Sequence, residues 1–329
     1  MIFGRNKLKN SGGDAQAQGW ERELLKELAT ASLKEQRRAR RWGIFFKLLT
    51  FAYLTAVLVV WLQGEIPEST LKPGSKHTAV VEVEGIIAPD SEASADKVIT
   101  GLRKAFKDSG TKGVILRINS PGGSPVQSGY INDEVVRLKE KYPDIPIYAV
   151  VTDLCASGGY YVAAAADKIY VDKASIVGSI GVLMNGFGFV ESMEKLGVER
   201  RLLTAGVNKA ILDPFSPLKE SDVVHIKRML ERIHQQFIAT VKAGRGERLK
   251  ESEELFSGLF WTGEESVQLG LADALGSSSY VAREVIGAEE IVDFTAKEEL
   301  LERLAKRLGA GATAALAAIV GVESTPVLR

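Results

Sequence analysis

The stretch GVILRINSPGGS, residues 113–124, joins a run of apolar and β-branched residues to a glycine-rich turn. This composition predicts a strand over 113–120, which the Pro-Gly-Gly that follows brings to an end. Upstream of it, TAVVEVEGII (78–87) alternates as a strand does, and DKVITGLRKAFKD (96–108) has the apolar spacing of a helix. The region therefore begins with a strand, a helix and a second strand.

The same alternation continues downstream. QSGYINDEVVRLKEKY (127–142) predicts a helix and IPIYAVVTDL (145–154) predicts a third strand. Strands that alternate with helices are typical of a parallel sheet with crossover helices, so we predict an α/β fold. Ligands usually bind at the carboxyl ends of such strands, where the turns SPGGS (120–124) and ASGGYY (156–161) both fall.

The overall composition excludes several classes of function. The chain has 329 residues, with 42 Lys and Arg against 42 Asp and Glu, so its formal net charge is zero and nucleic acid is not an expected partner. The three histidines, His77, His225 and His234, are scattered, and Cys155 is the one cysteine. We therefore expect neither a metal site nor a cofactor, and we interpret His225 and His234 as structural or surface residues.

An apolar segment near the start of the chain predicts a membrane anchor. WGIFFKLLTFAYLTAVLVVWL (42–62) has the length of a transmembrane helix, with Trp42 and Trp61 at its two ends. The basic run RRARR (37–41) precedes it directly. Because positively charged flanks stay in the cytoplasm, residues 1–41 are expected there, and the rest of the chain outside it, in the periplasm of a Gram-negative cell.

The remainder divides into a linker, a main domain and a C-terminal segment. Residues 63–77 predict a linker because they hold prolines and no apolar period, and the main domain is expected over 78–296. A long amphipathic helix is predicted over 219–245. The C-terminal segment, 297–329, combines a charged helix with an Ala/Gly-rich tail that is too short to span a membrane.

The sequence DLCASGGYYVAAAADKIYVD (153–172) places Ser157 on a two-glycine turn, with no histidine close by. A serine nucleophile needs a base, and a lysine can serve where burial lowers its pKa. Lys209 is a candidate because it stands among small and apolar residues after the strand-like RRLLT (200–204), but spacing alone does not select it. Cys155 is best interpreted as a small core residue.

A tetrahedral intermediate also needs backbone donors for its negative oxygen. The Pro-Gly-Gly turn can supply one N–H group, because glycine lets the backbone approach a substrate closely, and Gly158 can supply the other. Each of these motifs is weak when it is taken alone, since Gly-Gly turns after strands are common.

Together, the stretches resemble the signal peptide peptidase A (protease IV) family of membrane-anchored serine peptidases, in its short form with a single repeat. The resemblance covers residues 78 to about 285. Its motifs occur in the family's order, and they are INSPGGS (118–124), CASGGYYVAAAADKIY (155–170), SIVGSIGVL (175–183), AGVNKAILDPFSP (205–217) and LFSGLFWTGEESVQLGLADALG (255–276).

The resemblance implies a Clp protease/crotonase-like fold and a Ser-Lys catalytic dyad. Ser157 matches the nucleophile, Lys209 the general base, and Ser179 a hydroxyl that orients the lysine amine. Gly123 and Gly158 match the backbone donors of the family's oxyanion hole. One departure is visible, because Asn208 stands where the family usually has an aromatic residue before the lysine.

The function implied by the resemblance is that of a serine endopeptidase of the inner membrane, which degrades cleaved signal peptides and other hydrophobic peptides through an acyl-enzyme. Family members form ring-like homo-oligomers, so a homo-oligomer is expected on the same ground. Two alternatives remain open. One is a crotonase-like acyl-CoA enzyme, and the other is a non-catalytic protein that binds a partner, such as a stomatin-like membrane protein.

Overall fold

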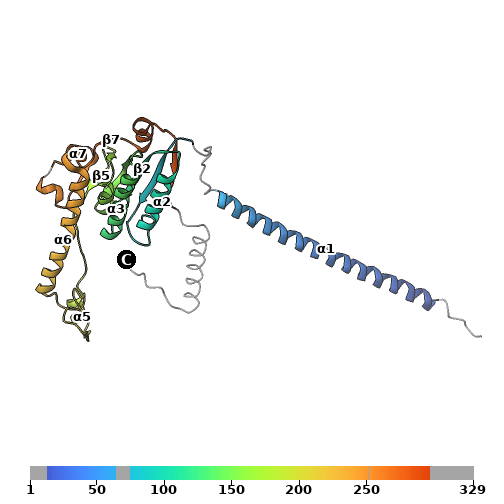
Figure 1. Ribbon diagram of the computed structural model, residues 1–329. Coiled ribbons are helices and arrows are strands. Elements are labelled where there is room, and N and C mark those ends of the chain that lie inside the picture. Colours follow the sequence, from blue (N-terminus) through green and yellow to red (C-terminus); the bar gives the residue numbers. More distant parts are fainter. Residues whose placement is uncertain (1–12, 64–74, 251, 297–329) are drawn as a thin grey trace, which may run out of the picture. The chain divides into compact units, whose positions relative to one another are not determined.

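The computed structural model describes residues 13–63, 75–250 and 252–296 (Figure 1). The chain divides into two units, Met1–Glu68 and Ser69–Arg329. Most of the expected linker, together with residues 1–12 and the C-terminal segment 297–329, lies outside the described residues.

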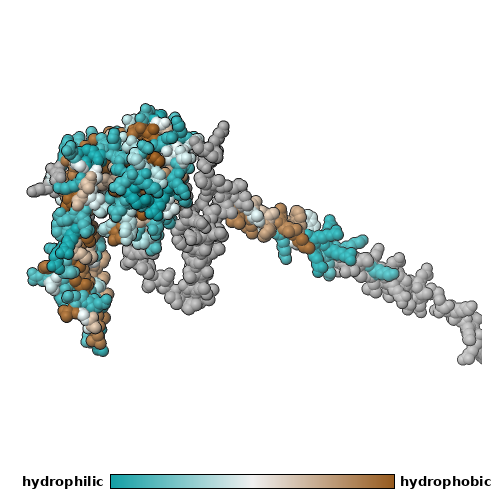
Figure 2. Space-filling view, viewed as in Figure 1, coloured by the Kyte–Doolittle hydropathy of each residue, from teal (hydrophilic) through white to brown (hydrophobic). Residues whose placement is uncertain are grey.

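The described part of the first unit is one helix, α1 (Gly13–Gln63). Its stretch Lys34–Leu58 is long and apolar enough to cross a membrane by length and composition, and none of its most apolar window is buried. Figure 2 shows apolar side chains gathered along this part of the helix. Trp42 packs against Phe45 and Phe46, with ring centroids 5.7 Å apart in each pair. The helix predicted at 42–62 is thus confirmed as the second half of a longer one.

The described residues of the second unit form eight strands and several helices. The strands are β1 (His77–Glu84), β2 (Thr111–Ser120), β3 (Ile147–Ala156), β4 (Lys168–Val171), β5 (Ile176–Gly178), β6 (Phe260–Thr262), β7 (Ala274–Leu275) and β8 (Ile291–Asp293). The α-helices are α2 (Ala95–Lys107), α3 (Pro125–Lys141), α4 (Gly158–Ala163), α5 (Val190–Lys195), α6 (Glu220–Arg245), α7 (Gly263–Gln268) and α8 (Ser278–Tyr280). Shorter helical turns are η1 (Gly246–Arg248), η2 (Glu253–Phe256) and the π-helical η3 (Val281–Ile286).

The strands form one sheet, in the order β6-β5-β3-β2-β1-β8, with β4 paired to β3 and to β7. Every pairing is parallel except that of β5 with β6. The α/β fold predicted from the sequence is confirmed, because its strands and helices are found within a few residues of their expected bounds and its long amphipathic helix is α6.

Alternate residues of the strands face two different cores. Val81, Leu116 and Ala149 belong to the large core under α2, α3 and α4, whereas their neighbours Val80, Ile115 and Val150 belong to a smaller core with η3. This period of two is the geometry of a strand, and burial on both faces is what a parallel sheet requires. Because the sheet is fixed from both sides, the turns at the carboxyl ends of β2 and β3 are held firmly.

Residues 182–219, here called the arm, leave the sheet after β5 and return to it through α6. In Figure 1 the arm and α5 lie at the end of α6 that is far from the sheet. Two contacts close the arm on itself. The N–H of Phe189 donates to the Pro214 carbonyl over 2.7 Å, and Arg200 pairs with Asp213 at 3.0 Å. The expected strand over 200–204 is wrong, because this part of the arm is irregular.

Candidate active site

The two glycine-rich turns lie side by side because β2 and β3 are paired. Ser120, at the end of β2, is in register with Cys155 of β3. The turn SPGGS follows the first strand and leads into α3, and the turn with Ser157 follows the second and leads into α4. The sheet therefore brings together two motifs that are more than thirty positions apart in the sequence.

Ser157 has an unusual backbone conformation. Its φ is 50° and its ψ is −122°, values that are rare for a residue with a side chain. The conformation is maintained by packing and by a hydrogen bond of 2.8 Å that the Ser157 N–H donates to the Gly178 carbonyl. Strain of this kind persists where the surrounding structure imposes it, and it is common at active sites. Its hydroxyl-bearing side chain is held between β3 and α4 and is half-buried.

The expected oxyanion donors, Gly123 and Gly158, lie against each other. A methyl group added to Gly158 would come within 3.1 Å of the Gly123 nitrogen, and one added to Gly122 within 2.5 Å of the Gly158 nitrogen. Gly123 pairs with Ile87 in an isolated bridge that uses the Gly122 carbonyl and the Ser124 N–H. The Gly123 N–H takes no part in this bridge, and the Gly158 N–H is the first of α4, so both are suited to bind an anionic oxygen.

Ser179 is connected to Ser157 through its neighbour. It directly follows Gly178, whose carbonyl accepts the hydrogen bond from Ser157. Ser179 also has a positive φ, 52°, and its own N–H donates to the Leu259 carbonyl over 2.7 Å. The structure therefore brings four of the five expected site residues, namely Ser157, Ser179, Gly123 and Gly158, to the same end of the sheet.

Lys209 lies elsewhere in the single chain. It is exposed, in a turn of the arm where its N–H donates to the Gly206 carbonyl over 3.1 Å. Among the described residues no contact joins Lys209 to Ser157 or to Ser179. A lysine acts as a base where burial lowers its pKa, and the arm of one chain provides no such burial. The dyad expected from the sequence is thus not assembled within the described part of one chain.

Other candidates for catalysis are structural. Cys155 is fully buried, and burial raises the pKa of its thiol, so it is not an activated nucleophile. The ring of His234 contacts the Ile180 carbonyl at 3.1 Å, and His225 lies beside Arg228. No group of three or more potential metal ligands occurs among the described residues. The alanines at 163–166 are buried in the large core, so they do not line the site.

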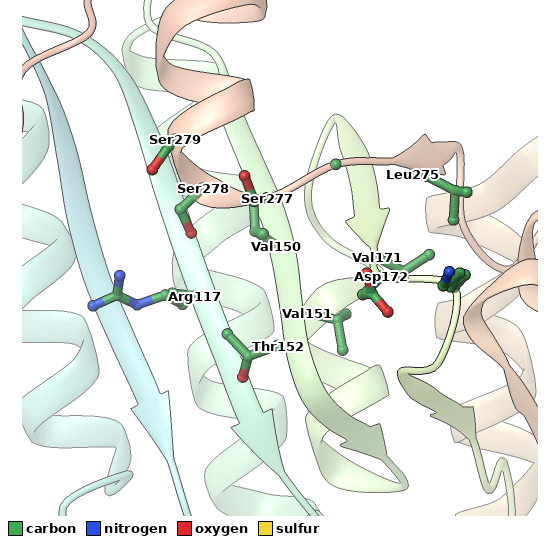
Figure 3. Close-up of a pocket in the computed structure, with 12 residues that line it drawn as sticks. Arg117, Val150, Val151, Thr152, Val171, Asp172, Leu275, Ser277, Ser278 and Ser279 are labelled. Carbon is green, nitrogen blue, oxygen red and sulfur yellow. The ribbon is translucent and has the colours of Figure 1, made fainter.

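Two cavities lie away from Ser157. One, of about 540 Å³, is lined by Arg117, Thr152, Asp172 and Lys173 together with the serines at 277–279 (Figure 3). The other, of about 840 Å³, is formed by the arm and the first half of α6. None of the five expected site residues lines either cavity, so neither one is the site expected from the sequence.

Comparisons with known proteins identify the family. The model of peptidase family S49 matches residues 139–291. A protein of Enterococcus faecium named "Putative signal peptide peptidase SppA" is 32% identical over 245 residues, which are 71% of each chain. The chain belongs to peptidase family S49. It is also similar to protease 4 of Haemophilus influenzae, at 33% identity over 65% of this chain and 35% of that protein.

Two further similarities are partial. A protein of Brucella abortus named as the Na(+)/H(+) antiporter NhaA is 46% identical over 186 residues, which are 56% of this chain. This chain spans only about a quarter of the length of that relative. A solved structure of a membrane-bound stomatin-specific protease superposes with a TM-score of 0.41 and 16% identity, over 67% of this chain and 97% of that one.

Proposed function

We propose that this S49 peptidase is a membrane-anchored serine endopeptidase with a Ser157–Lys209 dyad, and that it degrades hydrophobic peptides such as signal peptides released after secretion. The observation that carries the proposal is the conformation of Ser157. Its φ of 50° sets it at the start of α4, beside the backbone N–H groups of Gly123 and Gly158. A nucleophile next to two preorganised donors is the arrangement that acyl transfer requires.

The proposed reaction has two halves. Neutral Lys209 removes the proton from the Ser157 hydroxyl, whose oxygen attacks the carbonyl carbon of the peptide bond. The N–H groups of Gly123 and Gly158 stabilise the negative oxygen, and the lysine ammonium gives its proton to the leaving amine. A water molecule then attacks the acyl-enzyme with Lys209 as base, which releases the second product and restores the Ser157 hydroxyl.

Ser179 is proposed to orient the amine of Lys209. Support comes from its position one residue after Gly178, which accepts the Ser157 N–H. Its positive φ of 52° directs its side chain differently from that of a regular strand residue. A hydroxyl there can accept a hydrogen bond from a lysine amine that approaches Ser157, and can pass on a proton.

The dyad is proposed to form between two copies of the chain in a homo-oligomer. Lys209 is exposed on the arm, and the arm carries apolar side chains that a monomer would leave in water, as Figure 2 shows. The most exposed are Leu183 (80%), Phe187 (83%), Leu196 (78%), Leu203 (96%) and Val207 (94%). An apolar surface of this kind favours association, and association would bury the lysine, which favours the neutral amine that a general base needs.

The second half of α1 is proposed to anchor the protein in the inner membrane, with residues 1–41 in the cytoplasm and the catalytic unit in the periplasm. Support comes from its apolar stretch and from the basic run at 37–41 before it. In spheroplasts, externally added protease should digest the catalytic unit, and alkaline carbonate should leave the chain in the membrane pellet. Release into the supernatant would contradict the anchor.

The test of the catalytic assignment compares matched variants of the full-length chain in detergent. We expect Ser157→Ala to abolish labelling by a fluorophosphonate probe and to lower peptide hydrolysis at least about a thousand-fold. Lys209→Ala should do the same, whereas Lys195→Ala should remain active, because Lys195 is an exposed lysine elsewhere on the arm. Labelling or hydrolysis that survives in Ser157→Ala would refute the proposed nucleophile.

A further inference from the structure

Ser128 carries a buried hydroxyl without a hydrogen-bond partner, close to the proposed oxyanion hole. It lies in the second turn of α3, and its side chain is fully buried. Among the described residues, three buried polar side-chain atoms have no partner, and these are Ser75 Oγ, Ser128 Oγ and Arg245 Nη2. A buried polar group left unpaired destabilises a folded protein, so its presence calls for a physical reason.

A possible hydrogen-bond acceptor for the Ser128 hydroxyl lies close by in the same helix. A serine inside a helix commonly donates to the carbonyl group four residues earlier, which here belongs to Ser124. That carbonyl accepts the backbone N–H of Ser128, over 3.0 Å, but no hydrogen bond from the Ser128 hydroxyl. The orientation of the side chain is therefore set by the packing between α3 and the start of α4.

The Ser128 oxygen points at the glycine that follows the nucleophile. A methyl group built on Gly158 would lie 2.5 Å from Ser128 Oγ and 3.1 Å from the Gly123 nitrogen. Ser128 Oγ, Gly158 and the Gly123 N–H thus surround one point. The hydroxyl lies beside Gly158 and is covered by protein, so it has no direct contact with a substrate.

We propose that Ser128 is a positioning residue of the oxyanion hole, whose buried hydroxyl, close to Gly158 and to the Gly123 N–H group, helps these two donors to stabilise the negative oxygen. This inference rests on the proposed function. Because nothing holds the Ser128 O–H bond in the free chain, it can turn its positive end towards a charge that develops in the hole. A dipole that gains its interaction only in the transition state raises kcat and leaves substrate binding unchanged.

The proposal predicts that removal of the Ser128 hydroxyl has opposite effects on the stability of the protein and on its activity. Removal of an unpaired buried hydroxyl should stabilise the free protein, because the cost of its desolvation disappears. The same change should slow catalysis, because the charge in the hole loses a nearby dipole. Substitution of a serine with a merely structural role would not combine slower catalysis with unchanged or higher stability.

The experiment compares Ser128→Ala with the wild-type chain, both full-length and in detergent, by steady-state hydrolysis of an apolar peptide and by thermal unfolding. We expect kcat to fall about tenfold, KM to stay within about twofold, and Tm to stay the same or rise. The rate of labelling by a fluorophosphonate probe should fall by a similar factor, since that reaction also places a negative oxygen in the hole.

Ser266→Ala is the matched control, because Ser266 is also a fully buried helical serine but its hydroxyl donates to the Gly263 carbonyl over 2.7 Å. This control should lower Tm and leave kcat unchanged. An unchanged kcat in Ser128→Ala, or a fall in kcat together with a clear fall in Tm, would overturn the role of Ser128. The proposed function is tested separately, because it fails if Ser157→Ala keeps wild-type activity.

Discussion

At the scale of single residues, the candidate site depends on two turns that tolerate almost no added atoms. Gly123 has a φ of 152°, and a methyl group on it would come within 2.2 Å of the Ile87 carbonyl oxygen. The contact is with backbone, which cannot rotate away as a flexible side chain can. These turns therefore bring backbone groups closer together than any residue other than glycine permits.

Gly123→Ala should consequently lose both activity and stability. The added methyl group must displace the Ile87–Gly123 bridge, which moves the N–H of residue 123 away from its place in the proposed oxyanion hole. Gly129→Ala is the matched control, because Gly129 lies in α3 with no atom within 4 Å of an added methyl group. Alanine is favoured over glycine in a helix by about 0.5 to 1 kcal/mol, so Gly129→Ala should be as stable or more stable and fully active.

Thermal unfolding and peptide hydrolysis would measure both variants. If Gly123→Ala retained wild-type kcat and Tm, the close approach at this turn would not matter for function. A loss of activity in Gly129→Ala would show instead that α3 is sensitive to any substitution.

At the scale of elements, α3 is connected to α2 through one buried carboxylate. Glu134 is 7% exposed, and it accepts hydrogen bonds from Arg137 at 2.5 and 2.8 Å and from Arg103 of α2 at 2.7 Å. The hydrogen bonds from Arg137, together with Arg103, lower the pKa of Glu134 to about 2. Glu134 therefore adds an ion-paired link between the two helices, and this link depends on an ionised carboxylate.

This pKa predicts how stability depends on pH. A carboxylate whose pKa is lower in the folded state stabilises the fold above its unfolded pKa, near 4.5, and loses that contribution as the pH falls towards 2. Both arginines are about half exposed, so we expect a contribution of only about 1 to 2 kcal/mol at neutral pH.

Glu134→Gln tests this contribution by urea unfolding at a series of pH values. The variant should be less stable than the wild-type chain at pH 7, and the difference should shrink steadily between pH 4.5 and 2. Glu140→Gln, at an exposed position of the same helix, should show no such trend. A difference between Glu134→Gln and the wild-type chain that stays constant with pH would contradict the lowered pKa.

At the scale of the whole molecule, the proposed dyad requires Lys209 to come close to Ser157. The two residues lie on separate parts of the catalytic unit, one in the exposed arm and the other at the carboxyl end of β3. If the dyad forms between copies, two chains with different defects can complement each other. If the dyad forms within one chain, a mixture of two chains that each lack one of its residues stays inactive.

Complementation distinguishes these arrangements. Ser157→Ala and Lys209→Ala should each be inactive, and their co-expression in one membrane should restore activity, to roughly a quarter of the wild-type level where copies mix at random. The reason is that some interfaces then pair an intact serine with an intact lysine. A co-expressed mixture as inactive as either variant alone would refute a dyad shared between copies.

The α/β fold could be predicted from the sequence because its signals are local. Apolar and β-branched runs mark β1 to β3, helical spacing marks α2, α3 and α6, and the glycine turns mark where two strands end. The positions of Ser157, Gly123 and Gly158 could be predicted as well, since each lies within a few residues of a strand that the pattern locates. The irregular course of the arm was missed, because its apolar residues have the composition of strands and no partner strand.

What the sequence determined by itself is the order of strands and helices, the apolar helix and the family resemblance, and it named the candidate site residues. Only the tertiary structure decided that Ser157 has a positive φ, that the Ser128 hydroxyl lies unpaired beside Gly158, and that Lys209 is exposed. Secondary structure follows from regular spacing along the chain, which can be read locally. These three features follow from contacts between segments far apart in the sequence, for which no local pattern exists.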